Sequence, residues 1–244
     1  MQLEGFNNLT KCLSFNLYDF CVASCESERK SYIEFLKENY SAGPITKALK
    51  GICEIIEANV ISVSDQDYDP WGASSLVLMS DVKGSGVGAA ASSHMHLDKS
   101  HICAHTYPDF DFQNDLCSIR IDIDIATCGE ISPLNALNFM FQSFETDIVV
   151  VDYVVRGFTR DSDGKRIFMD HEVRSIQDFI APEILKQYEC VDLNIASDNI
   201  WQTKMQRVEF DTDEYFVEPK VYEGQKQDLL KKIQKEMRDI LFLR

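Results

Sequence analysis

The sequence predicts an α+β fold in which helices pack on an antiparallel or mixed β-sheet. Residues 117–128, CSIRIDIDIATC, alternate four isoleucines with an arginine and two aspartates, as a strand with one buried and one polar face does. The order strand–helix–strand over 117–128, 132–144 and 147–159, with short connections, indicates helices laid on one face of a sheet. The chain has 244 residues, which is ample for a core, and we expect one domain over residues 1–244.

Each element follows from a local pattern. Apolar residues recur at helical spacing in 28–40 and 44–59, and two strand-like runs flank a Pro-Trp-Gly turn within 60–81. Ser132 is a suitable N-cap, and Pro133 suits the first helical position. These patterns predict helices over 28–40, 44–59, 132–144, 175–188 and 225–241. They predict strands within 60–81 and over 100–107, 117–128 and 147–159.

Two more segments bear on the organisation of the chain. Residues 82–95 are expected to form a flexible loop, because their glycines and small side chains cannot bury enough surface to order themselves. Their Gly-Ser-Gly-Val-Gly run lacks the spacing of a phosphate-binding fingerprint. The closing helix, 225–241, has one apolar side, which predicts packing on the sheet or on a neighbouring subunit.

The net charge argues against some classes of partner, and the cysteines bear on the compartment. The formal net charge is −16, which argues against nucleic acid and anionic membranes, since phosphate binding needs a basic surface. The same charge is compatible with a cationic ligand or with solubility alone. No apolar run has the length of a membrane span, and we identify no signal peptide. The eight cysteines form no Cys-x-x-Cys motif, which argues against a zinc ribbon or a thioredoxin-type site. Because no secretory signal is identified, we expect reduced thiols and a cytoplasmic protein.

The densest group of reactive side chains is 96-HLDKSHICAHTYPD-109, which directly follows the loop. One interpretation is a metal site, because four of its residues are zinc ligands by type: His96, His101, Cys103 and His105. Their origin in one short stretch argues against a site, and we expect no dedicated metal cluster. A second interpretation is that His101, Cys103 and His105 share one strand face as satisfied polar groups of a mixed core.

A third interpretation is covalent chemistry at Ser100. Its hydroxyl can attack the carbonyl of Lys99, which turns the amide into an ester. A base then removes the α-proton of Ser100, the ester carboxylate leaves, and water converts the dehydroalanine into a pyruvoyl group. His105 has the acid–base character of such a base. Because five residues separate Ser100 from His105, a regular strand would turn them to opposite faces. We therefore expect Ser100 to precede the regular strand, or the strand to bend there.

This segment resembles the self-cleavage site of the pyruvoyl-dependent S-adenosylmethionine decarboxylases, in particular their longer bacterial subtype. The resemblance reaches from the N-terminus to about residue 211, whereas the loop at 82–95 and the C-terminal tail differ from the family. It implies a two-layer sandwich of helices on a sheet. Beyond 96–109 it is carried by 5-GFNNLTKCLSF-15, 67-DYDPWGAS-74, 126-ATCGEISPLNALN-138, 152-DYVVRGFTRD-161, 170-DHEVRSIQDF-179 and 203-TKMQRVEFD-211.

The resemblance implies a cut between Lys99 and Ser100. Residues 1–99 would become the β chain and residues 100–244 the α chain, with Ser100 converted to the pyruvoyl group. His105 matches the family's processing histidine.

Further roles follow from the resemblance for three residues. Ser74 matches a serine that assists processing. Cys128 matches the cysteine that returns a proton to the substrate carbon, after the pyruvoyl carbonyl has formed a Schiff base and taken up the electrons left by CO₂. Tyr68 matches an aromatic residue that stacks on adenine. Taken alone, Cys128 could equally be a buried thiol ahead of a turn glycine, and Tyr68 a packing aromatic.

The resemblance implies that the chain is an S-adenosylmethionine decarboxylase, which supplies the aminopropyl donor for spermidine synthesis. It also implies a homo-oligomer of cleaved protomers, and Mg²⁺ as a further requirement. Asp109 departs from the family, which usually has glutamate there, so its reach toward a substrate is one methylene shorter. That leaves open a homologous decarboxylase of L-ornithine or L-arginine. From another class, an uncleaved and catalytically dead regulatory partner also stays open. No role is assigned to Asp170, His171 and Glu172.

Overall fold

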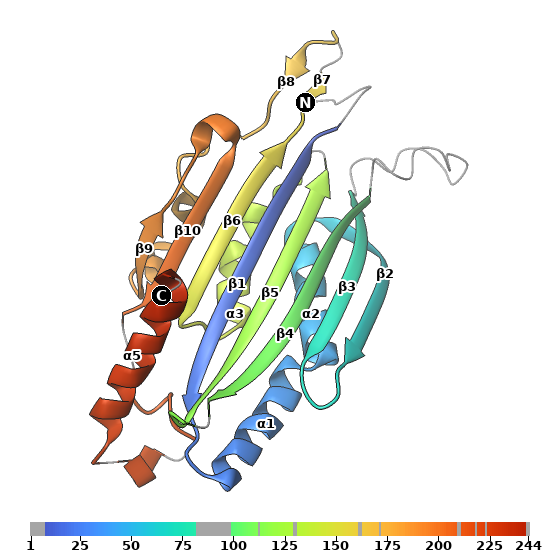
Figure 1. Ribbon diagram of the computed structural model, residues 1–244. Helices are drawn as coiled ribbons and strands as arrows, with labels where there is room; N and C mark the ends of the chain where they lie inside the picture. The colour runs from blue at the N-terminus through green and yellow to red at the C-terminus, as the bar shows by residue number, and fades with distance from the viewer. Residues whose placement is uncertain are drawn as a thin grey trace.

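The computed structural model describes residues 8–81, 99–111, 113–128, 131–160, 163–170, 172–208, 211–217, 219–222 and 224–242. Within these residues, eight strands form one antiparallel sheet in the order β2-β3-β4-β5-β1-β6-β10-β9 (Figure 1). They are β1 (Thr10–Val22), β2 (Ala58–Asp67), β3 (Ala73–Asp81), β4 (Lys99–Asp111), β5 (Leu116–Cys128), β6 (Ile148–Arg156), β9 (Tyr188–Asp192) and β10 (Ile200–Arg207). The short strands β7 (Thr159–Arg160) and β8 (Arg166–Ile167) form a separate pair.

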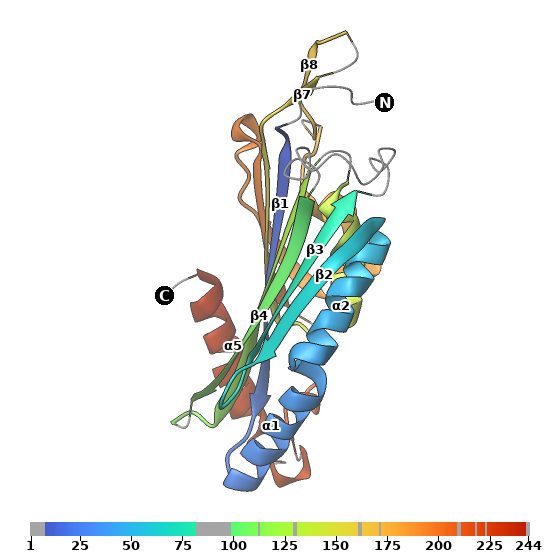
Figure 2. The same ribbon diagram turned by 90° about the vertical axis from the view of Figure 1, so that its right-hand side faces the viewer.

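Helices lie on both faces of this sheet, as Figure 2 shows. One face carries α1 (Glu26–Tyr40), α2 (Ala42–Ile55) and α3 (Leu137–Ser143), and the other carries α5 (Lys226–Phe242). We call these the helix-covered face and the open face. The remaining helical segments are short: α4 (Pro182–Leu185) and the 3₁₀ turns Pro133–Ala136, Ile176–Phe179, Ala196–Asp198 and Pro219–Tyr222.

The main core lies between the sheet and α1 to α3. In β1, Leu13, Phe15 and Leu17 are at most 1 % exposed, whereas the residues between them are only partly buried. The four isoleucines of β5 are equally buried, so both central strands turn their apolar side toward the helices. Burial of such a side chain contributes roughly 1.5–3 kcal/mol, which fixes the register of the sheet, since a slip by one residue would expose them all.

A second, smaller core attaches α5 to the open face. Ile233 and Met237 are fully buried and pack with Phe20 of β1 and Ile148 of β6. Lys204 of β10 donates a hydrogen bond from Nζ to the carbonyl of Leu241, 2.9 Å away, near the end of the helix. The closing helix therefore packs on the sheet, but on the face opposite the other helices.

Most expected elements are confirmed. The α+β class is confirmed, and so are helices at 28–40 and 225–241, the strands within 60–81, and the three strands that follow. The helix expected at 44–59 ends at Ile55, after which the chain turns into β2. At 132–144 Pro133 begins the helical segment, but the Ser132 side chain makes no capping hydrogen bond. The loop expected at 82–95 lies outside the described residues.

One expected helix is wrong. Residues 175–188 form two short turns, Ile176–Phe179 and Pro182–Leu185, rather than one helix. Ala181 between them is extended, with φ −61° and ψ 139°, because the residue before a proline is driven out of the helical region. Strands β1, β9 and β10 had not been assigned at all. Among the described residues, no helix combines the length and apolar character needed to span a bilayer.

Candidate functional site

Ser100 and Cys128 meet at one end of the sheet. Ser100 is 2 % exposed near the start of β4, and its Oγ accepts a hydrogen bond from the backbone N–H of Cys128, 3.2 Å away. The ladder between β4 and β5 begins one residue later, at His101 and Ala126. If the β4–β5 ladder continued past His101, a backbone carbonyl of β4 would accept the Cys128 N–H. The Ser100 hydroxyl accepts this hydrogen bond instead.

A second group crosses three strands on the open face. Antiparallel pairing sets Ser74 of β3 beside His105 of β4, and His105 beside Asp122 of β5. Directly opposed side chains in such pairs have Cβ atoms about 4.5–5.5 Å apart. The pairing thus brings two sequence-predicted residues together, Ser74 and His105, and adds a carboxylate to them. We call these three residues the histidine row.

Asp122 was missed as a functional residue. Burial raises the pKa of its carboxyl, while the charges of Arg120 and His105 act against that rise. Arg120 Nη2 lies 3.1 Å from Asp122 Oδ2. The hairpin symmetry of β4 and β5 about 113–114 would have paired 105 with 122, but only if both strand boundaries had been known.

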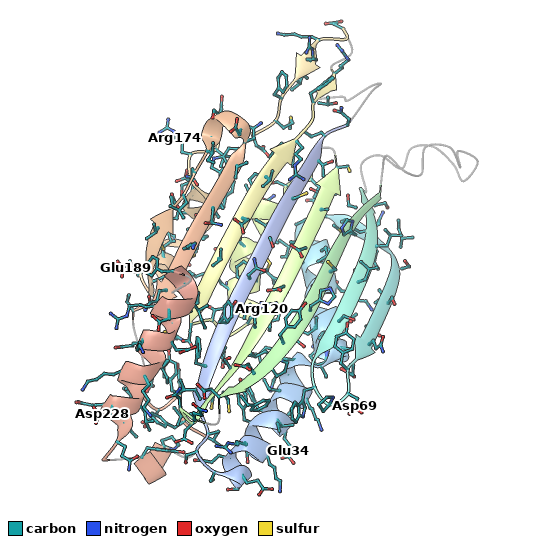
Figure 3. All side chains as sticks on the ribbon, viewed as in Figure 1. Glu34, Asp69, Arg120, Arg174, Glu189 and Asp228 are labelled. Carbon is teal, nitrogen blue, oxygen red and sulfur yellow. The ribbon has the colours of Figure 1, made fainter. Side chains whose placement is uncertain are left out.

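Arg120 also forms one wall of a cavity of about 290 Å³ between α5 and the sheet. Its guanidinium carbon lies 4.3 Å from the centroid of the Tyr107 ring, and Figure 3 shows the residue over the open face. Asp109 lines the same cavity. The predicted substrate contact therefore lies on the open face, as the histidine row does.

Tyr68 lies in a different cavity, of about 320 Å³, together with side chains of α1. Its ring belongs to the turn that Gly72 closes, where φ is +101° and an added Cβ would lie 2.8 Å from the Thr106 carbonyl. Glycine is needed there, because side chains rarely adopt this conformation. Within one chain, Tyr68 and Asp109 thus line separate cavities.

Ser100 and the histidine row are not brought together. The alternation of β4 turns Ser100 toward the helix-covered face and His105 toward the open face. Five residues of strand separate them, which is roughly 16 Å. The side chain of Lys99, the other residue of the expected cut, lies outside the described part of the structure.

The remaining candidates fall into two groups. His101, Cys103 and His105 alternate on the open face of β4, and no cluster of three or more His, Cys, Asp and Glu within the described ranges is arranged to hold a metal ion. His96 lies outside those ranges. On the helix-covered face, Asp170 accepts a hydrogen bond from Tyr153 and lies 3.6 Å from the buried Lys11 ammonium, so these three side chains form one polar network.

Comparison with known proteins identifies relatives over most of the chain. A family model described as S-adenosylmethionine decarboxylase matches residues 40–157. A protein from Stenotrophomonas maltophilia named S-adenosylmethionine decarboxylase proenzyme is 50 % identical over 226 residues, which cover 90 % of this chain and 86 % of that protein. A proenzyme of the same name from Xylella fastidiosa is 48 % identical over the same shares. A solved structure described as the adenosylmethionine decarboxylase from Aquifex aeolicus is 19 % identical, with a TM-score of 0.35 over 62 % of this chain and 91 % of that one.

Proposed function

Because this chain belongs to the S-adenosylmethionine decarboxylase family, we propose that it is a self-processing carboxy-lyase. It decarboxylates S-adenosylmethionine by means of a pyruvoyl group made from Ser100, and its product is the aminopropyl donor for spermidine synthesis. The observation that carries the proposal is the buried Ser100 hydroxyl held at Cys128, in a chain about half identical to proteins named proenzymes.

Processing starts from the Ser100 hydroxyl. Its oxygen attacks the carbonyl carbon of Lys99, so that a C–O bond replaces the C–N bond of the peptide. Loss of the Ser100 α-proton then expels the Lys99 carboxylate and leaves dehydroalanine, whose hydrolysis by water releases ammonia and gives the pyruvoyl group. The Cys128 N–H holds the Ser100 Oγ at the end of the ladder and limits the directions in which it can move.

The environment of Ser100 fits the group that would form there. A residue that is 2 % exposed is screened from bulk water, and such screening strengthens every local electrostatic interaction. The pyruvoyl group supplies a carbonyl that withdraws electrons from the bond to the substrate carboxylate. The backbone N–H of Cys128 lies next to position 100. The Cys128 thiol is the proposed donor of the proton that ends the reaction.

The histidine row supports an assembly of several protomers. His105 needs a proton-transfer partner, yet Ser100 of the same chain is roughly 16 Å away along β4. We propose a homo-oligomer in which the open face of a second copy brings its histidine row to Ser100. The two residues then act across the interface, with Asp122 orienting His105 and Tyr68 and Asp109 binding the substrate.

The cytoplasm is the proposed location. Mg²⁺ finds no dedicated donor set among the described residues, and no step is assigned to it. The Asp109 carboxylate, one methylene short of the usual family residue, keeps L-ornithine and L-arginine as comparison substrates.

Release of labelled CO₂ from each of the three substrates tests the function. S-adenosylmethionine should be turned over at least roughly a hundredfold faster than the other two, because a site built around adenine leaves polar groups unpaired when adenine is missing. Ser100→Ala is the matched control and should release nothing. Faster turnover of ornithine or arginine would show that this amino acid, and not S-adenosylmethionine, is the substrate. Release of as much CO₂ by the Ser100→Ala chain as by the parent would show that the reaction does not use a pyruvoyl group made from Ser100.

A further inference from the structure

An arginine lies next to the histidine row on the open face. Antiparallel pairing sets Arg120 of β5 between Tyr18 of β1 and Tyr107 of β4, and its guanidinium lies over the Tyr107 ring. Arg120 is two residues from Asp122 on the same strand, so both side chains point to the same face. The strand therefore sets a cation directly beside the carboxylate of the histidine row.

The contact between them is a salt bridge. Arg120 Nη2 and Asp122 Oδ2 are within hydrogen-bonding distance, at 3.1 Å. The side chains are 40 % and 22 % exposed, respectively, so solvent screens the pair only in part. Burial acts to lower the pKa of Arg120, but a hydrogen bond to Tyr18 and the charge of Asp122 raise it above its usual value. The guanidinium thus stays charged.

His105 faces charges of both signs. Asp122 is its direct partner on β5, and Arg120 and Asp124 are the diagonal neighbours on that strand. On β3 its partner is the uncharged Ser74. The other titratable neighbours are a thiol and a phenol on the same face of β4, and a carboxyl of α5 that lines one cavity with Arg120: Cys103, Tyr107 and Glu236. Arg120 is the cation of this set.

This balance of charges bears on the state of the imidazole. The proposed processing takes His105 as the base that removes the Ser100 α-proton, and a histidine accepts a proton only in its neutral form. A carboxylate beside an imidazole favours the protonated form, whereas a nearby cation disfavours it. Asp122 alone would orient His105 and also favour its protonation. A cation bound to Asp122 offsets the second effect and leaves the first.

We propose that Arg120 is a positioning residue for processing, which holds the Asp122 carboxylate in place beside His105 and balances its charge, so that the imidazole is oriented and still able to accept a proton. This inference rests on the proposed self-processing. It predicts opposite effects for two neighbouring changes. Removal of the guanidinium should raise the titration midpoint of the imidazole, and removal of the carboxylate should lower it. A general loss of packing would not give opposite signs.

The midpoint can be measured without any catalysis. The sample is the full-length Ser100→Ala chain with labelled histidine Cε1, titrated by NMR, and a His105→Gln chain assigns the signal. Arg120→Gln should raise the midpoint by about half a pH unit, and Asp122→Asn should lower it by about as much. Arg120→Lys keeps the charge and should restore most of the parental value. Arg174→Gln is the matched control: it is exposed and lies apart from Arg120 (Figure 3), and it should change nothing.

The rate of the cut gives the second readout, in chains that keep Ser100. Arg120→Gln should slow the cut about threefold on the acidic side of the midpoint, as a half-unit shift requires. The loss should shrink at higher pH, where the imidazole is neutral in both chains. Circular dichroism checks folding, and Arg120→Met is read instead if Arg120→Gln does not fold.

The two readouts fail separately. An unchanged or lowered midpoint in the folded Arg120→Gln chain would overturn the role of Arg120, as would a slower cut whose loss is the same at every pH. A parent chain that stays uncut would contradict the proposed function instead, and the titration does not depend on it because the Ser100→Ala chain is uncut by design.

Discussion

Ser100 and His105 lie on opposite faces of β4. Ser100 is almost fully buried and pairs with the buried Met79, whereas His105 pairs with Ser74 and Asp122 on the open face. A strand that pairs regularly on both sides cannot rotate one of these residues to the other face without losing its ladder. We therefore propose that a reaction that needs both residues takes them from two copies of the chain.

Mixed oligomers test this directly. Ser100→Ala and His105→Ala should each be inactive alone. Isolated mixed dimers of the two chains should show roughly half of the parental activity, because one of the two sites in each mixed dimer then has both residues. Activity is measured as CO₂ release after copurification through two different tags. No recovery in a verified mixed dimer would contradict action across the interface.

Asp122 is predicted to position His105. Asp122→Asn keeps the shape of the side chain but removes its charge, and should slow processing at least roughly tenfold, since acid–base groups contribute strongly only when oriented. The midpoint of the pH dependence of processing should also move, which a merely structural role would not cause. Asp124→Asn is the control, because Asp124 is on the same face but bonded to Ser14 at 2.6 Å. Equal effects of the two changes would argue against the role.

Cys128 is predicted to act through its backbone in processing and through its thiol in turnover. Cys128→Ser should still be cut, because the N–H that contacts Ser100 remains. Its kcat should fall roughly a hundredfold with the loss of the proton donor. Electrophoresis follows the cut, and CO₂ release follows turnover. Cys190→Ser, at the far edge of the sheet, should change neither. A Cys128→Ser chain with parental kcat would exclude the thiol.

The buried carboxyls make stability depend on pH. Burial raises the pKa of Asp147 to about 6, above its value in the unfolded chain, so the folded state binds the proton more tightly. Stability from this group is greatest below the unfolded pKa and is lost as the pH rises toward 6. Asp147→Asn should therefore gain stability relative to the parent by about 1 kcal/mol between pH 5 and pH 7. Urea unfolding at both pH values measures it, and a constant difference would show that Asp147 does not titrate there.

The sequence predicted those parts of the fold that depend on local periodicity. The alternating isoleucines of 117–128 predicted β5, because one face of this strand packs in the core and the other face is polar. The helix predicted over 175–188 was wrong because the apolar spacing there is helical, whereas Pro182 lacks the N–H that a continuous helix would need at this position. β1 was missed although Leu13, Phe15 and Leu17 alternate with partly buried residues, because the buried Lys11 precedes them and Phe20–Val22 at the end of the strand are buried in succession.

The candidate site was predictable only in part. Ser100 and His105 could be named because one contiguous motif, 96–109, carries both, and Cys128 because it lies in a second motif, 126–138. The partnership of His105 with Asp122 joins two strands across a turn, and no window of sequence contains it. The placement of α5 on the open face depends on which side of the sheet was still uncovered, which periodicity does not encode.

The intact mass of the purified protein shows whether the chain cuts itself before Ser100. We expect two polypeptides that together replace the 27.9 kDa chain. One ends at Lys99, and the other begins at position 100 and is one ammonia lighter than the same piece starting with serine. A single polypeptide of full mass, with serine intact at position 100, would contradict it.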